Sequence, residues 1–430
     1  MSTLLRTAIA LALLPAAPVL AATATETPVE ANESLVRLDR VNVFGSRAEV
    51  EKTAGSAHYI DQATLERFNF RDVNRVLRQV PGVYVVEEEG FGLRPNIGIR
   101  GSGTDRNSRI TVMEDGVLIA PAPYAAPAAY YFPTMARINA VEILKGSASV
   151  IAGPRTTGGA VNLITTPIPT ETSGEVDVSL GSDATLLAHG WVGTMGERFG
   201  ALIEGVRQQT DGFKRIDGGG DTGYSLNDFV GKLRWVSAPD AARYQQIDLK
   251  IGRNTQDSNE TYLGLTDADF SLDLNRRYAA SRLDNIQTEQ HLYELRHLIE
   301  LSDKVDLTTV AYRTEFQRNW YKLNDVQGVS ISSILADPAT YADQYAWISG
   351  EDSPANALRL RNNNRSYYAQ GIQSVLGIGF ATGEASHDLE IGLRVHRDQE
   401  DRYQNDDRFQ MLGGELVLTT DGAPGTQDNR

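Results

Sequence analysis

The sequence has 430 residues, of which 41% are hydrophobic and 23% are charged, and its formal net charge at pH 7 is −15. This acidic balance argues against a protein that tracks nucleic-acid phosphates, which would carry a basic face. The chain contains no cysteine, which excludes disulfide scaffolds, thiolate zinc sites and thiol catalysis.

Residues 1–22 have the layout of a secretory signal peptide. Arg6 precedes an apolar run over residues 8–20, and small residues follow at Ala21, Ala22 and Ala24. The run is short for crossing about 30 Å of hydrocarbon, so a transmembrane anchor is the weaker interpretation. We therefore expect an exported protein. No later stretch of the sequence is long and apolar enough to predict a membrane-spanning helix.

Residues 23–49 are expected to form a flexible N-terminal segment, because residues 23–34 are small, polar and acidic without apolar periodicity. Within it, Val41 and Val43 alternate with polar neighbours. A short extended segment of this kind can add itself as a strand to the edge of a partner's sheet.

Residues 50–168 are expected to form a compact domain of helices and strands. Apolar residues at helical spacing predict one helix over residues 65–80, which Pro81 and Gly82 end. Short strands are expected at residues 83–86, 97–100, 110–113 and 141–144, separated by glycine, asparagine and aspartate turns.

Residues 169–430 show a different pattern, in which apolar and polar residues alternate. Leu389, Ile391, Leu393 and Val395 are the clearest series. The strands reach about ten residues, enough to cross a bilayer at a tilt. Short turns are expected near residues 195–198, 238–242, 302–304 and 382–385, and long polar loops near residues 209–226, 254–288 and 319–364. Short turns at one end and long loops at the other are typical of outer-membrane barrels.

The pattern gives about nine such strands, and an odd number does not close an ordinary bacterial barrel. We therefore expect the natural protein to continue beyond residue 430. Aromatic residues towards the strand ends are expected to form an interfacial belt. They are Trp191, Trp235, Tyr244, Tyr312, Trp320, Tyr367 and Tyr368.

Four stretches carry a resemblance to a known family. They read VLRQVPGVYV from residue 76, NIGIRG from residue 96, ITVMEDGVLI from residue 110 and AVEILKGSASVIAGPRTTGGAVNLITT from residue 140. In this order they resemble the plug domain of TonB-dependent outer-membrane receptors. The stretches GFGLRPNIGIRGSGTDR and APAPYAAPAAYYFP are most similar to ferric dicitrate transporter-like receptors. The resemblance implies an α+β plug domain inside a transmembrane antiparallel β-barrel of 22 strands. Residues 169–430 would be the N-terminal part of this truncated barrel, with only the first nine or so strands, and the C-terminal half would be missing.

The resemblance also implies a function. It predicts an active transporter in the Gram-negative outer membrane that imports a ferric chelate, ferric citrate or a carboxylate siderophore, into the periplasm. Its partners would be TonB with the inner-membrane energising complex, the chelate, and outer-membrane lipid and lipopolysaccharide, and the protein would be a monomer. Iron would enter only as part of the cargo, with no resident cofactor. The alternative is import of another nutrient, such as cobalamin, an oligosaccharide or a different metal chelate.

Site residues follow from motif positions. The TonB box would comprise Asp39, Arg40, Val41, Asn42, Val43 and Phe44. Plug loops that face outward would bind the ligand through Arg94, Asp105, Arg106, Asn107 and Tyr124. Arginine offers bidentate recognition of carboxylates, although each position could also be an ordinary polar loop residue.

Arg100 and Lys145 match family positions that lock the plug to acidic barrel residues; the competing interpretation is solvated surface charge. The sequence has no GxSxG, HExxH or P-loop motif and no complete EF-hand loop, and its six histidines are scattered. It therefore predicts neither an enzyme nor a metal site.

Overall fold

The structure, a computed structural model, describes residue 50 and residues 55–128, 130–259 and 261–428. These residues belong to one compact unit. The expected signal peptide and TonB box lie outside the described residues. Among the residues that are described, no helix is both long and apolar enough to cross a membrane.

Residues 55–166, called the plug below, fold around a five-stranded sheet in the order β1-β6-β7-β4-β5, with a separate two-stranded sheet β2-β3. The strands are β1 (Ser56–Ile60), β2 (Val83–Val86), β3 (Asn96–Ile99), β4 (Ile110–Glu114), β5 (Val117–Leu118), β6 (Ile138–Lys145) and β7 (Gly159–Thr165). The helices are α3 (Gln62–Phe68) and α4 (Val73–Arg78), with 3-10 turns η1 (Asp105–Asn107), η2 (Met135–Arg137) and η3 (Gly146–Ala152). Val76, Ile97, Ile143 and Leu163 are buried in its core. The expected mixture of helix and strand is confirmed.

The prediction of one helix over residues 65–80 is wrong, because the chain breaks between α3 and α4. Asn69 ends α3 in the left-handed conformation, with φ of 44°. The Asp72 carboxylate then accepts the backbone N–H of Asn74 at 2.8 Å and starts α4 as an N-cap. Capping chemistry outweighs the apolar spacing that runs through both helices.

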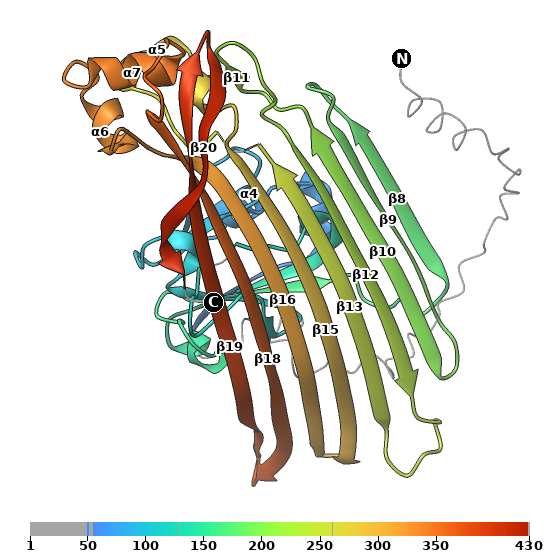
Figure 1. The fold of residues 1–430 in the computed structure, drawn as a ribbon. Coiled ribbons are helices and arrows are strands. Elements are labelled where there is room, and N and C mark those ends of the chain that lie inside the picture. The colour runs from blue at the N-terminus through green and yellow to red at the C-terminus, as the bar shows by residue number, and fades with distance from the viewer. Residues whose placement is uncertain (1–49, 51–54, 129, 260, 429–430) are drawn as a thin grey trace, which may run out of the picture. The chain divides into compact units, whose positions relative to one another are not determined.

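Long antiparallel strands form the second part of the structure, and Figure 1 shows them side by side. In chain order they are β8 (Ser173–Leu180), β9 (Leu186–Met195), β10 (Phe199–Thr210), β12 (Tyr224–Val236), β13 (Gln245–Ser258), β15 (Asn285–Ser302), β16 (Val305–Val326), β18 (Leu358–Thr382), β19 (Ala385–Leu412) and β20 (Glu415–Asp428). Each pairs with its sequence neighbour in this series, and β17 (Val329–Ser330) adds to β16. The described residues hold ten such strands, one more than the expected number of about nine.

The expected turns and loops are confirmed. The chain reverses between Met195 and Phe199, between Val236 and Gln245, between Ser302 and Val305, and between Thr382 and Ala385. Long connections join β10 to β12, β13 to β15, and β16 to β18 at the opposite ends of the strands. The strands extend several residues further into the second and third loops than the polar sequence indicated.

The sheet has two chemically different faces. Side chains of alternate residues, among them Asp228, Lys250 and Gln373, contact the plug, and we call this the plug-facing side. The intervening side chains form the outer face, where Leu180 is 81% and Leu393 is 72% exposed. An apolar band on an exposed face of paired strands is the pattern of a β-barrel wall in contact with lipid.

The expected aromatic belt needs a correction. Tyr312, Trp320 and Tyr367 are buried on the plug-facing side rather than placed at a lipid interface. Phe316 and Tyr367 even join the plug's main apolar core. These rings therefore help to seat the plug against the sheet.

The three long connections pack against one another through the helices α5 (Asp267–Leu272), α6 (Ile331–Ala336) and α7 (Ala342–Ser349) and the strands β11 (Arg215–Ile216) and β14 (Arg276–Arg277), beside the 3-10 turn η4 (Ala279–Ser281). Figure 1 shows α5, α6 and α7 together beyond the ends of the strands. The Asp269 carboxylate accepts the hydroxyls of Tyr278 and Tyr345 at 2.6 Å each and pairs with Arg276 at 2.6 Å. Arg276 also pairs with Asp217 at 2.9 Å, so one cluster ties all three loops together.

The apolar band on the outer face generates a stability prediction. Replacing Ile391 by arginine places a charge among apolar side chains of β19, and we expect it to lower the free energy of unfolding of the whole receptor in liposomes by about 2 kcal/mol or more. Gln399→Arg, on the same face of the same strand but in its polar part, should cost less than about 1 kcal/mol. Urea titration of both variants measures this difference. Equal costs would contradict the assignment of the band to lipid.

Candidate ligand site and plug contacts

A buried ion cluster joins the plug to the sheet. Arg137, at the end of η2, pairs with Glu114 of β4 and with Asp228 of β12 at 2.7 Å each, and all three side chains are 1% exposed. Lys250 of β13 pairs with Glu114 at 2.7 Å and with Asp115 at 2.6 Å.

Lys232 of β12 completes this arrangement. Its ammonium donates to the Thr165 hydroxyl and to the Thr166 carbonyl oxygen at 2.6 Å each, and it lies 3.9 Å from Asp115. The six charged residues, called the anchor cluster below, are Glu114, Asp115, Arg137, Asp228, Lys232 and Lys250. Three cations therefore balance three carboxylates.

Charge balance makes the anchor cluster stable when buried. Burial alone would raise the pKa of the Glu114 carboxyl, but Arg137 and Lys250 outweigh burial and lower this pKa to about 2. The pKa of Asp115 is lowered in the same way, against burial, by Lys250 and Lys232. Removing one partner from a buried pair typically costs about 3–5 kcal/mol, because the other charge is left without compensation.

Arg100 and Lys145, the residues expected to lock the plug, lie elsewhere. The Lys145 ammonium donates to the Pro81 carbonyl oxygen at 2.9 Å. Burial, and then the nearby Arg100 guanidinium, lower the pKa of Lys145. Within the described ranges, neither residue forms an ion pair with the sheet, so their locking role stays a prediction. Sequence reasoning missed the anchor cluster, whose members are separated by up to 136 residues.

A second cluster of cations and aromatic rings lies where η1 meets the plug-facing side near the long loops. The Arg106 guanidinium lies 5.2 Å from the ring of Tyr130 and 5.3 Å from that of Trp320, and it pairs with Glu88 at 2.5 Å. Arg318 lies 4.1 Å from the Tyr130 ring, and the ammonium of Lys322 lies 4.0 Å from the Trp320 ring.

Tyr262, from the loop between β13 and β15, closes this arrangement, with its ring 3.7 Å from the Lys322 ammonium and 5.0 Å from Trp320. We call these residues the apical cluster: Arg106, Tyr130, Tyr262, Arg318, Trp320 and Lys322. It gathers three cations around three aromatic rings, and among the described residues Glu88 is the one carboxylate in ion-pair contact with them. Cations held over rings in this way are positioned without being neutralised.

Several buried donors in the apical cluster have no protein partner among the described residues. Arg318 is 3% exposed and Trp320 is 5% exposed. The Nε and Nη2 atoms of Arg318 and the indole Nε1 of Trp320 have no hydrogen-bond acceptor. A buried donor without an acceptor is costly, so such atoms indicate a place for a ligand oxygen.

The structure places the five predicted ligand residues in different environments. Arg106 belongs to the apical cluster, and Asp105 beside it is exposed. Arg94 and Asn107, expected on outward-facing loops, are 2% and 1% exposed, and the Asn107 side-chain oxygen accepts the Ile97 N–H at 2.5 Å. Their role in ligand binding stays a prediction. The structure does not bring all five residues together.

Tyr124 lies apart from the apical cluster. It is 48% exposed, its ring lies 5.0 Å from that of His396, and its backbone N–H donates to Asp398 at 2.6 Å. Sequence reasoning missed Tyr262, Arg318 and Lys322 and gave Trp320 another role. The sequence feature that could have identified them is the alternation of Arg318, Trp320 and Lys322, because alternate residues lie on one face of a strand.

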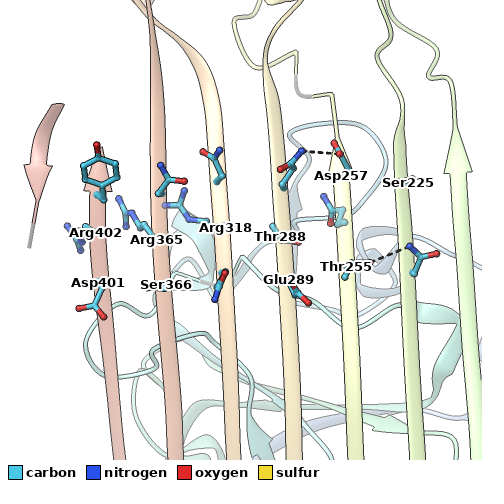
Figure 2. A pocket seen from close by; sticks show the side chains of 17 residues that line it. Ser225, Thr255, Asp257, Thr288, Glu289, Arg318, Arg365, Ser366, Asp401 and Arg402 are labelled. Carbon is cyan, nitrogen blue, oxygen red and sulfur yellow. Dashed lines mark hydrogen bonds between the residues drawn. The ribbon is translucent and has the colours of Figure 1, made fainter. Parts of the chain in front are cut away.

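A polar hollow of about 700 Å³ also crosses the strands near their loop ends. Figure 2 shows its lining side chains in a row across the sheet, with Asp257 hydrogen-bonded to its neighbour. Asn227, Thr255 and Asp257 alternate with the plug-facing Asp228, Asn254 and Gln256, so the hollow opens mainly on the outer face. Arg318 of the apical cluster is among its lining residues, so the hollow adjoins that cluster.

Together these contacts hold a small α+β domain against one face of a long antiparallel sheet whose other face is apolar and exposed. This is the plug-and-barrel fold of outer-membrane receptors. Residues 49–160 match the family described as TonB-dependent Receptor Plug Domain. The chain therefore contains a plug domain of this family and has the fold of TonB-dependent outer-membrane receptors.

Individual relatives support this assignment. The vitamin B12 transporter BtuB of Photobacterium profundum is 24% identical over 358 residues, which are 82% of this chain and 55% of the relative. The solved structure of the unliganded ferric citrate transporter FecA has a TM-score of 0.68 at 19% identity, covering 89% of this chain and 52% of that one. The siderophore receptor PiuA from Acinetobacter baumannii has a TM-score of 0.58 at 17% identity, covering 86% and 48%. The chain thus spans about half the length of the proteins it matches.

The pKa of Glu114 gives the plug contacts a defined pH dependence. Because it is lowered from 4.5 to about 2, the ionised carboxylate stabilises the folded state above about pH 4.5, and this contribution is lost as the pH falls towards 2. This lowering of the pKa corresponds to a contribution on the order of 3 kcal/mol to the free energy of unfolding. We expect Glu114→Gln to lower the free energy of unfolding at pH 7 and to flatten its decline between pH 4.5 and 2.

Urea unfolding of the whole receptor in detergent, repeated at several pH values, measures this decline. Glu66→Gln is the control, because Glu66 is an exposed plug carboxylate that accepts a hydrogen bond from Gln62 of the same helix. If the wild type and Glu114→Gln lose stability in parallel below pH 4.5, a different group carries the acid sensitivity.

Proposed function

We propose that the protein is a TonB-dependent active transporter that imports an anionic ferric chelate, either ferric citrate or a carboxylate siderophore, into the periplasm. The observation that carries the proposal is the apical cluster, where Arg106, Arg318 and Lys322 meet and where buried donors of Arg318 and Trp320 lack acceptors among the described residues. Two adjacent guanidinium nitrogens suit the two oxygens of a carboxylate. The structure of FecA is that of a ferric citrate transporter, which agrees with this chemistry.

The proposal assigns the remaining parts of the chain as follows. Residues 1–22 are the signal peptide, residues 23–49 the segment with the TonB box, residues 50–168 the plug domain, and residues 169–430 barrel wall. Asp39 to Phe44 couple to TonB by strand addition. Transport of this kind requires no catalytic residue and no resident cofactor, and the transporter works as a monomer.

Cobalamin import is the second candidate, favoured by the likeness to a vitamin B12 transporter. Binding separates the two, because a cluster of three cations selects for an anion over a larger ligand of low charge. Titration of the whole receptor in detergent with ferric citrate and with cyanocobalamin provides the comparison.

Arg318→Gln tests the ligand site itself. Loss of its charge-assisted hydrogen bonds should weaken ferric citrate binding about tenfold or more. Trp320→Phe, which removes only the indole donor, should have a smaller effect in the same direction. Arg207→Gln, a half-buried cation on β10 bonded to Asn227, is the matched control and should bind as the wild type does. Wild-type affinity in Arg318→Gln would refute this site.

Energy coupling is tested by uptake of radiolabelled iron, supplied as ferric citrate to cells that carry the whole gene. Deleting residues 39–44 should abolish uptake, while binding to the purified receptor persists. Equal uptake with and without the segment would show that coupling occurs elsewhere. Uptake of cobalamin but not of iron would favour the second candidate.

A further inference from the structure

Three consecutive glutamates follow β2, and they differ in what their carboxylates contact. Glu87 accepts a hydrogen bond from Arg78 of α4 at 2.7 Å. Glu89 is 4% exposed and accepts backbone N–H groups of its own loop, the shorter of them at 2.5 Å. These two carboxylates therefore hold the local structure of the plug. Glu88 is the member of this run whose carboxylate pairs with Arg106 in the apical cluster.

The pair between Glu88 and Arg106 is close but incompletely bonded. A carboxylate oxygen of Glu88 lies 2.5 Å from Nη1 of Arg106, and yet this buried nitrogen has no acceptor with hydrogen-bond geometry among the described residues. Proximity without alignment keeps the attraction between the two charges but loses much of the hydrogen bond. A carboxylate that approached the guanidinium in its plane would bond to it better, so the partner of Arg106 can be exchanged.

Glu88 is placed so that its side chain can leave Arg106. It is 20% exposed, and it lies in the irregular connection between β2 and β3 rather than within a strand. Arg106 is held more firmly, because its side chain is 11% exposed and its guanidinium lies within 5.3 Å of the rings of both Tyr130 and Trp320. An exchange of partners therefore moves the carboxylate and leaves the cation in place.

The charges of the apical cluster make this exchange selective. Three cations face one carboxylate among the residues that the structure describes, which leaves an excess of two positive charges. An anion with a single carboxylate must bind beside Glu88, whose like charge repels it. An anion with several carboxylates can replace Glu88 on Arg106 and pair with Arg318 at the same time. A like charge built into a site thus favours one class of ligand by disfavouring another.

We propose that Glu88 is a resident competitor of the ligand. Its carboxylate occupies Arg106 in the empty receptor, is displaced by a chelate that carries several carboxylates, and rejects anions that carry only one. This role rests on the proposed function, because it defines which class of anion the same site accepts. Glu88 is then a specificity-determining residue, and the selectivity it provides lowers the affinity for the ligand that is accepted.

Calorimetric titration of the whole receptor in detergent with ferric citrate, iron-free citrate and acetate tests this role. Glu88→Gln keeps the shape of the side chain and removes its charge. We expect this variant to bind ferric citrate about tenfold more tightly than the wild type, and acetate to compete with ferric citrate in the variant only. Glu87→Gln is the matched control, because Glu87 is the neighbouring carboxylate and pairs with Arg78 instead, and it should bind as the wild type does. In an Arg106→Gln background, the gain from Glu88→Gln should largely disappear.

Three outcomes would contradict the proposal. Equal or weaker binding of ferric citrate by Glu88→Gln would make Glu88 a residue that positions Arg106. A gain that persists in Arg106→Gln would show that Glu88 acts through the overall charge of the site and not by occupying Arg106. If the wild type has no affinity for ferric citrate, the proposed cargo is wrong, and iron-free citrate then provides the separate test: no gain in citrate binding by Glu88→Gln would overturn the role of Glu88 as well.

Discussion

The buried charge balance between Glu114, Asp115, Arg137 and the sheet residues Asp228, Lys232 and Lys250 is the interaction on which the rest of the structure depends. Neither side can bury these groups alone, because an uncompensated ion in a low-dielectric interior costs several kcal/mol. Apolar packing would tolerate a plug rotated or shifted along the sheet, whereas three cations facing three carboxylates define one position. That position sets Arg106 of the plug beside Trp320 of the sheet and so completes the apical cluster.

The same constraint explains why the sheet is polar inside and apolar outside. Strand residues alternate between the two faces, so the charged positions that contact the plug leave the intervening positions to the outer face. Those positions are apolar over the part of each strand that faces lipid and polar beyond it, where Figure 2 shows amides, hydroxyls and carboxylates. One alternation therefore gives the sheet a charged plug-facing side and an outer face that is apolar over part of each strand.

Short-range patterns predicted much of this fold. Alternation along residues 389–395 and the four short turns depend only on neighbouring residues, and the plug strands follow the family's motifs. Contacts between distant residues could not be predicted from the sequence. Glu114 and Lys250 are 136 residues apart, and only the register of the strands brings them together. Trp320 was assigned to a lipid interface for the same reason, because alternation identifies two faces but does not say which one the plug covers. The break at Asn69 was missed because an apolar spacing can continue through a capped interruption.

One strand joins the two clusters, and this bears on how a ligand could be released. Arg106 lies in η1, just before β4, and β4 ends at Glu114 in the anchor cluster. Parallel pairing with β7 holds β4 in place between the apical cluster and the anchor cluster. Ligand binding can shift a coupled equilibrium by typically about 1–3 kcal/mol, whereas breaking even one buried ion pair of the anchor costs about 3–5 kcal/mol. A ligand at the apical cluster can therefore rearrange residues around Arg106, but it cannot by itself free the plug. Displacing the plug requires work from another source, which is the role that energy coupling through a segment before the plug would fill.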